Sequence, residues 1–309
     1  MTMDAGYRQT SKIEKELIKE LKKEYSKASV ELKQKMLKAM QGFEVEDKMK
    51  KAELAKGVIT DADYWKWRNG KLSNVKWMNS LSEEYARRIS AINGQSIYSI
   101  NDSCDKIYTL NINAGAKEIT AATGISFSQV SIETVQRLLD EKTVVLPAKM
   151  PKKISYSRKR LKQYKDIRWN MRKIKSELTQ GILQGESIPK MARRIQKVTL
   201  ANSKVATRAA RTAVTSAQNG GRMDAYRRAE RMGIKVDKQW VATHDSRTRK
   251  SHLDMDGEQV ALNEEFSNGL MFPADPYGEP SEVYNCRCTM IPITENGQEK
   301  GEESLDVVY

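Results

Sequence analysis

The sequence predicts a mainly α-helical protein: a helical N-terminal arm, a basic helical core and a small α+β strand–turn module near the C-terminus. Apolar residues recur at intervals of three and four through most of the first 235 residues, as in amphipathic helices. After Gly233 this pattern gives way to short alternating stretches. The 309 residues are enough for more than one core.

The first predicted region, residues 1–146, is a helical arm. Residues 11–40 carry an apolar stripe that includes Leu17, Leu21 and Leu32, which predicts one long helix. Ser11 and Glu14 resemble a capping box at its start. Helical spacing returns over residues 72–92 and 100–119, so we expect two further helices there.

The second region, residues 147–235, is a basic helical core. Apolar residues between 161 and 178 predict one helix, and residues 187–198 and 202–232 predict two more. The last of these helices has a stripe of alanines followed by Gly220 and Gly221, so we expect another helix to approach it closely. Arg208 and Arg211 stand among small residues, and we expect them to form buried ion pairs. We also expect the chain to stay folded and to bind DNA without residues 1–146.

The third region, residues 236–294, is expected to be a small strand–turn module. Residues 235–242, 258–261 and 287–293 are its predicted strands, and Asp256-Gly257 is typical of a tight turn. Residues 295–309 are polar and acidic, and we expect them to form a tail.

Charge is distributed unevenly along the chain. The net charge is +14, yet residues 147–235 hold 24 Lys and Arg against 5 Asp and Glu, and residues 244–309 hold 5 against 14. Clustered positive charge without a base-reading motif predicts non-specific binding to double-stranded DNA through phosphates. The predicted phosphate-binding residues are Lys152, Lys153, Arg158, Lys159, Arg160, Lys162, Lys165, Arg168, Arg172 and Lys173. A solvated helical surface is the alternative explanation.

Composition excludes other classes of protein. The mean hydropathy is −0.67, and no stretch approaches the roughly 18 apolar residues of a membrane helix, so we expect no membrane partner. The first residues lack the apolar segment of a secretory signal. Three cysteines are too few for a disulfide framework, so we expect an intracellular origin.

Both histidines and two of the cysteines gather near the C-terminus. His252, Cys286 and Cys288 offer one imidazole and two thiols from separated segments, which is raw material for a structural zinc site. Alternatively, the cysteines are ordinary buried residues of a small fold. A third interpretation is a metal- or Cys-dependent hydrolase or nuclease built on the same cluster. The sequence leaves all three open.

Several short motifs occur in a specific order from residue 157 to 292. The residues that we expect to converge as a structural motif are Trp240, Asp245, Arg247, Thr248, Asp256, Gly257, Asn285 and Arg287. Before them stand the Glu186-Ser187 pair with Arg194, and the string from Asn219 to Arg222. In this order and spacing the chain resembles the Mu-F-like phage head morphogenesis family, minor capsid proteins of tailed bacteriophages.

The resemblance implies a structural protein and no catalytic residue. It implies assembly in the host cytoplasm and a final place in the virion, in the capsid interior or at the portal vertex. By the same resemblance, its partners would be the portal and capsid proteins and the packaged double-stranded DNA. Several copies would associate with one another on the portal. A DNA-binding protein outside the virion remains the alternative.

One departure from the family pattern affects the metal site. The family often carries Cys-x-x-Cys after the Asp-x-Arg-Thr motif, where this chain has Arg249 and His252, and a His-Pro where it has Val283-Tyr284. A four-ligand zinc site would therefore need His244 or Asp245.

Overall fold

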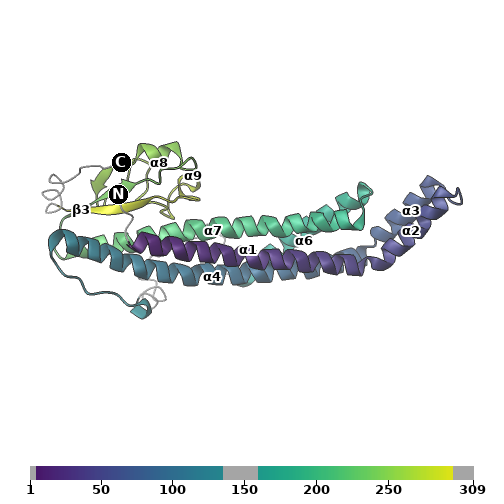
Figure 1. Ribbon diagram of the computed structural model, residues 1–309, viewed down its shortest axis with the longest axis horizontal. Helices are drawn as coiled ribbons and strands as arrows, with labels where there is room; N and C mark the ends of the chain where they lie inside the picture. The colour runs from purple at the N-terminus through teal and green to yellow at the C-terminus, as the bar shows by residue number, and fades with distance from the viewer. Residues whose placement is uncertain (1–4, 135–158, 295–309) are drawn as a thin grey trace. The chain divides into compact units, whose positions relative to one another are not determined.

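The computed structural model describes residues 5–134 and 159–294, without the side chains of residues 5, 75 and 159–166. Long helices dominate it, and a three-stranded sheet lies near the C-terminus (Figure 1), which confirms the predicted fold class. The elements are α1 Ala5–Ala39, α2 Gln41–Ala55, α3 Asp61–Leu72, α4 Val75–Thr123, α6 Lys159–Leu183, α7 Ile188–Arg231, β1 Val236–Val241, α8 Lys250–Asp254, β2 Gln259–Ala261, α9 Pro280–Val283 and β3 Thr289–Thr294. No helix in these ranges has an 18-residue window apolar enough to cross a membrane.

The helices are longer than the sequence pattern predicts. Helix α1 already begins at Ala5, so the predicted cap at Ser11 is wrong. Helix α4 runs through the expected break near residue 96, and α7 runs through the one near residue 200. At each break a polar side chain bonds back to the carbonyl four residues earlier: Ser96 to Ile92 at 2.8 Å and Asn202 to Val198 at 2.9 Å. These polar residues therefore fit inside a helix.

The described residues fall into two compact units. The helical unit contains residues 19–97 and 159–206, and the mixed unit contains residues 5–18, 98–134 and 207–294. Both units draw on the predicted arm and on the predicted basic core. The predicted boundary near residue 147 and the acidic tail lie outside the described residues.

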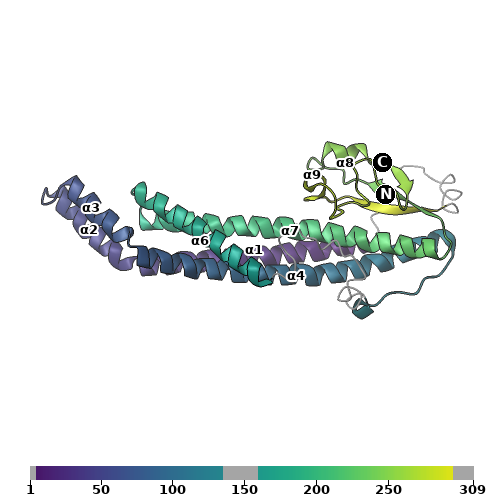
Figure 2. The same cartoon turned by 180° about the vertical axis from the view of Figure 1, so that it is seen from behind.

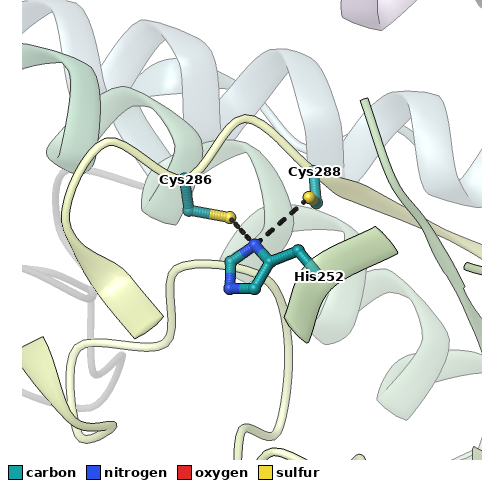
Figure 3. Close-up of side chains that lie close together, drawn as sticks. All are labelled: His252, Cys286 and Cys288. Atoms are coloured by element: carbon teal, nitrogen blue, oxygen red, sulfur yellow. Dashed lines mark hydrogen bonds between the residues drawn. The ribbon is translucent and has the colours of Figure 1, made fainter. Parts of the chain in front are cut away.

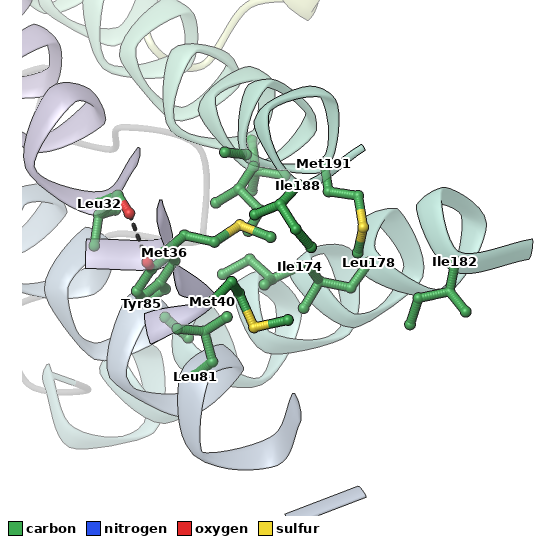
Figure 4. Close-up of a cluster of buried hydrophobic side chains, with 14 of the residues drawn as sticks. Leu32, Met36, Met40, Leu81, Tyr85, Ile174, Leu178, Ile182, Ile188 and Met191 are labelled. Atoms are coloured by element: carbon green, nitrogen blue, oxygen red, sulfur yellow. Dashed lines mark hydrogen bonds between the residues drawn. The ribbon is translucent and has the colours of Figure 1, made fainter. Parts of the chain in front are cut away.

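The helical unit is built around one apolar core. Side chains from α1, α4, α6 and α7 meet in it (Figure 4). Tyr85 of α4 donates a hydrogen bond to the carbonyl of Leu32 in α1 at 2.5 Å, and Asn202 of α7 donates to Asn170 of α6 at 3.0 Å. This core draws on residues from both sides of residue 146, and the expectation that the chain folds without residues 1–146 stays a prediction.

Helices α2 and α3 form a hairpin in the helical unit. Thr60 and Asp63 form a capping box at the start of α3. Phe43 and Trp67 stack with ring centroids 5.6 Å apart and join the two helices. The connection between α6 and α7 packs on α3, since a Cβ at Gly185 would lie 2.5 Å from the Trp65 ring.

In the mixed unit α4 and α7 cross closely. A Cβ at Gly221 would lie 2.6 Å from the carbonyl oxygen of Tyr108, so only glycine fits there. The close approach predicted for the small-residue stripe is confirmed. Arg222, fully buried, donates two hydrogen bonds to Glu118, at 2.6 and 2.9 Å.

The expected buried pairs of Arg208 and Arg211 are wrong. Arg208 is exposed and lies over the Tyr284 ring, and Arg211 is part-exposed and 4.0 Å from Glu14. The buried arginine of this helix is Arg222, about three turns after Arg211 along α7. Arg211 and Arg222 lie within about 20° of one another on the helix surface, so sequence spacing does not show which of them is buried.

The sheet has the strand order β2-β1-β3, and both pairings are antiparallel. The three strands lie where the sequence predicts them. Burial alternates along β1, which turns Val236, Lys238 and Trp240 inward. Both views place β3 alongside α7 (Figure 2), and Gln218 of α7 donates a hydrogen bond to Thr289 of β3 at 3.1 Å.

Candidate functional site

The structure brings His252, Cys286 and Cys288 together in the mixed unit. His252 lies on α8, and the cysteines lie on the segment between α9 and β3 (Figure 3). The Nδ1 atom of His252 is 3.7 Å from Sγ of Cys286 and 3.5 Å from Sγ of Cys288. Each of the three residues is 1% exposed. The cluster therefore sits inside the module and not in a surface cleft.

Helix α7 holds the segment that carries both cysteines. Thr215 donates a hydrogen bond to the carbonyl of Cys286 at 2.7 Å, and Asn219 donates to that of Cys288 at 3.1 Å. Asn285 adopts a positive φ of 57°, a conformation that Asn accepts more readily than most residues. The chain therefore turns at Asn285 and presents the two thiols to His252.

The imidazole ring of His252 is fixed from its other side. Its Nε2 atom lies 2.9 Å from a carboxylate oxygen of Glu282, and its ring packs edge-on against Trp240. A carboxylate can only accept a hydrogen bond, so Nε2 carries a proton, and Nδ1 faces the two thiols. This arrangement orients a ligand nitrogen before any ion binds.

The two thiols influence each other's ionisation. A hydrogen bond from Cys286 lowers the pKa of the Cys288 thiol, burial opposes this, and His252 lowers it further. The same hydrogen bond, followed by burial, raises the pKa of Cys286. One thiolate is therefore favoured in the cluster, with the other cysteine as its donor.

The three donor atoms are of the kind that zinc binds, but they are one fewer than a tetrahedral zinc site needs. One imidazole nitrogen and two sulfurs within 4.8 Å of one another supply three of four tetrahedral positions. His244 and Asp245, which the sequence offered as the fourth ligand, lie outside this group. Nε2 of His244 is 2.7 Å from Asp256, and Asp245 pairs with Arg287.

Asp245 and Arg287 form a polar clamp beside the cluster. The guanidinium of Arg287 donates to both carboxylate oxygens of Asp245, at 2.5 and 2.6 Å, and Thr248 lies 3.3 Å from both partners. The side chain of Arg247, exposed, adds a longer contact of 3.2 Å. Arg287 holds the pKa of the Asp245 carboxyl well below its usual range.

The other residues of the predicted structural motif also lie in this module. Asp256 accepts a hydrogen bond from the backbone amide of Ala242 at 2.7 Å, next to the end of β1. Gly257 follows with a φ of 82°, so the predicted tight turn needs a glycine there. Trp240 is fully buried against His252 and Phe266.

The predicted phosphate-binding residues are described only in part. Lys152, Lys153 and Arg158 lie outside the described residues. The backbone places Lys159, Arg160, Lys162 and Lys165 in α6, without their side chains. Arg168, Arg172 and Lys173 are exposed on α6, and Lys173 lies over the Trp169 ring.

Sequence reasoning missed Glu282, Thr215 and the role of Asn219. Glu282 contacts His252 across 30 residues, and Thr215 contacts Cys286 across 71. Thr215 and Asn219 are four residues apart on one side of α7, and this spacing was the one available signal.

Most of the antiparallel sheet and all of the His252 cluster lie in a segment that is similar to known proteins. A family model described as "Phage Mu protein F like protein" matches residues 172–291. This segment is similar to Mu F-like proteins and is called the Mu F-like segment below. The Mu F-like segment includes α7, the sheet strands β1 and β2 and the whole His252 cluster. The resemblance stated from the motifs is confirmed.

Curated relatives extend the comparison. The chain is 26% identical over 236 residues to "Minor head protein GP7" of Bacillus phage SPP1, which covers 73% of each chain. It is 34% identical over 139 residues to "NAD(+)--arginine ADP-ribosyltransferase EFV" of Enterococcus faecalis, covering 44% of this chain and 28% of that protein. It is 27% identical over 130 residues to the uncharacterized protein YqbB of Bacillus subtilis, covering 40% of this chain and 42% of that protein. No solved structure matches.

Proposed function

We propose that the chain acts as a structural minor head protein of a tailed bacteriophage, in head morphogenesis. The observation that carries this is the similarity to a minor head protein over 73% of both chains, because it includes the helical regions as well as the Mu F-like segment. The named ADP-ribosyltransferase is matched over 28% of its own length, so we do not propose its activity for this chain.

The first test is genetic. A phage that lacks this gene should make fewer DNA-filled heads, and a plasmid copy should restore their number. Electron microscopy of lysates provides the count. Normal numbers of filled heads without the gene would contradict the proposal.

Its partners in the head are the portal and capsid proteins, and several copies gather on the portal. The α2–α3 hairpin supports such a contact, because α2 has no buried residue and the apolar side chains of Val45, Met49 and Val58 are all more than half exposed. Replacing these three with Ser should leave folding intact and reduce incorporation into heads. Equal incorporation of the parent and the variant would mean that the contact with the head lies outside the α2–α3 hairpin.

The protein also touches packaged double-stranded DNA without reading its sequence. The charge excess of residues 147–235 and the exposure of Arg168, Arg172 and Lys173 support this contact. A phosphate contact weakens as salt rises, so binding to random duplexes should fall steeply with ionic strength. Salt-independent binding, or none at all, would contradict it.

We propose that the His252 cluster supplies three of the four ligands of a structural zinc site. When bound, zinc would link α8 to the segment before β3, with His252, Cys286 and Cys288 as ligands. Elemental analysis of protein purified without chelator should find close to one zinc ion per chain. Cys286→Ser should lose it, and His244→Ala is the control. If the parent protein contains no metal, the zinc proposal fails, and His252, Cys286 and Cys288 are held together by hydrogen bonds alone.

The rival function is a Cys-dependent hydrolase or nuclease. The lowered pKa of Cys288 beside His252 favours it, but both side chains are 1% exposed, which leaves a substrate no access to the sulfur. Native protein should therefore react slowly with iodoacetamide at Cys288. Rapid alkylation would favour the enzyme.

A further inference from the structure

Helix α7 carries a straight row of cations that the sequence analysis did not single out. Arg193, Lys197 and Lys204 follow one another at intervals of four and seven residues. At 100° per residue these positions lie within about 40° of one another on the helix surface. All three are exposed, and they belong to the helical unit.

The opposite face of the same helix segment is buried. Met191, Ile195, Val198 and Asn202 face the core of the helical unit. The row therefore points away from this core, and its direction is fixed by the packing behind it. A rise of 1.5 Å per residue places Arg193 and Lys204 about 16 Å apart.

The row has no acidic neighbour on its own helix. Residues 188–223 contain no Asp or Glu, so 36 residues of α7 pass before Asp224. Arg194 and Lys190 lie beside the row and are already paired with Glu186, at 2.6 and 3.2 Å. Among the described residues, the ion pairs found on this helix segment involve Lys190 and Arg194 and none of Arg193, Lys197 and Lys204.

The row lacks the anchors of a protein interface. Residues 188–225 contain no Phe, Trp or Tyr, and Leu200 is the only large apolar side chain between Lys197 and Lys204 on this face. Protein interfaces depend on buried aromatic and apolar anchors, whereas nucleic-acid backbones are bound by exposed cations. The row from Arg193 to Lys204, about 16 Å long, runs past roughly ten phosphate charges of a duplex when both strands are counted.

We propose that Arg193, Lys197 and Lys204 of α7 form a second phosphate-binding surface for double-stranded DNA, separate from the basic residues of α6. This proposal rests on the DNA contact in the proposed function and adds the residues and the face. A single straight row binds the backbone along one groove edge and reads no base.

The test compares two triple variants that lose the same charge. The first is Arg193→Gln, Lys197→Gln and Lys204→Gln. The control is Lys51→Gln, Arg87→Gln and Lys106→Gln, whose side chains are exposed and already paired with carboxylates on their own helices at 2.6 to 2.8 Å. Circular dichroism melting checks that both fold.

Fluorescence anisotropy with a random-sequence duplex, repeated at several salt concentrations, gives the affinity and its salt slope. The α7 variant should reduce the magnitude of the slope by about 2.7, since each phosphate contact contributes about 0.9. The control should keep the slope of the parent.

Three results would overturn the proposal. Equal salt slopes for the α7 variant and the control would show that Arg193, Lys197 and Lys204 make no phosphate contact, while the proposed DNA contact of the protein would stand. Competition by poly-glutamate as strong as by duplex DNA would assign the row to an acidic protein. A parent protein that binds no duplex at low salt would defeat both this proposal and the DNA contact.

Discussion

The helical unit and the C-terminal module are held together by different forces. The helical unit buries apolar side chains from helices far apart in sequence, such as Leu32, Ile89, Leu178 and Ile195. The module has a smaller apolar core and relies on polar contacts: Asn219 to the chain before β3, Arg287 to Asp245, and His252 to two thiols. Truncation of one buried aliphatic side chain should therefore destabilise the helical unit. Removal of one hydrogen-bonding group should destabilise the C-terminal module.

The largest effect is expected in the helical unit. Ile195→Ala removes a side chain that is 1% exposed and leaves a cavity between α7 and its neighbours, so the free energy of unfolding should fall by about 2–5 kcal/mol. Leu200→Ala, on the exposed face of the same helix, should change it by less than about 0.5 kcal/mol. Urea unfolding measures both. Equal losses would mean that this face of α7 is not the core.

A smaller effect is expected from Asn219 in the module. Asn219→Ala leaves the carbonyls of Pro273 and Cys288 without their donor, and the free energy of unfolding should fall by about 1–3 kcal/mol. Asn263→Ala, an exposed site, is the control. If the two variants unfold alike, α7 does not hold the cysteine segment.

The smallest effect is a pH dependence. Arg287 holds the pKa of Asp245 below its usual range, so the ion pair stabilises the folded state fully above the unfolded pKa of about 3.9 and loses this effect as the pH falls through the folded value. The difference in Tm between parent and Asp245→Asn should therefore be greatest near neutral pH and shrink in acid. Asp254→Asn, at the end of α8, is the control. A difference that grows in acid would reverse the assignment.

The two regions also differ in how far the sequence predicts them. Helices, strands and the turn at Gly257 follow from local patterns, because periodicity and backbone freedom are local properties. Helix continuity through Ser96 and Asn202 was missed, since a polar side chain that bonds back to its own helix looks like a break. Arg222 was missed as the buried arginine because it shares its face of α7 with the part-exposed Arg211.

The site was predictable to a different degree. His252, Cys286 and Cys288 could be grouped by residue type, and the structure brings them within ligand distance. Glu282 and Thr215, which orient the ring and the cysteine segment, could not be found because their contacts cross 30 and 71 residues. Local spacing carries no information on such contacts.

The central claim is that this chain is a structural component of a phage head. Quantitative mass spectrometry of purified DNA-filled heads and of empty proheads tests it most directly. The account predicts the chain in both preparations, at far fewer copies than the major capsid protein. Its absence from both, with recovery in the soluble lysate, would contradict the account and favour a non-virion DNA-binding protein or an enzyme.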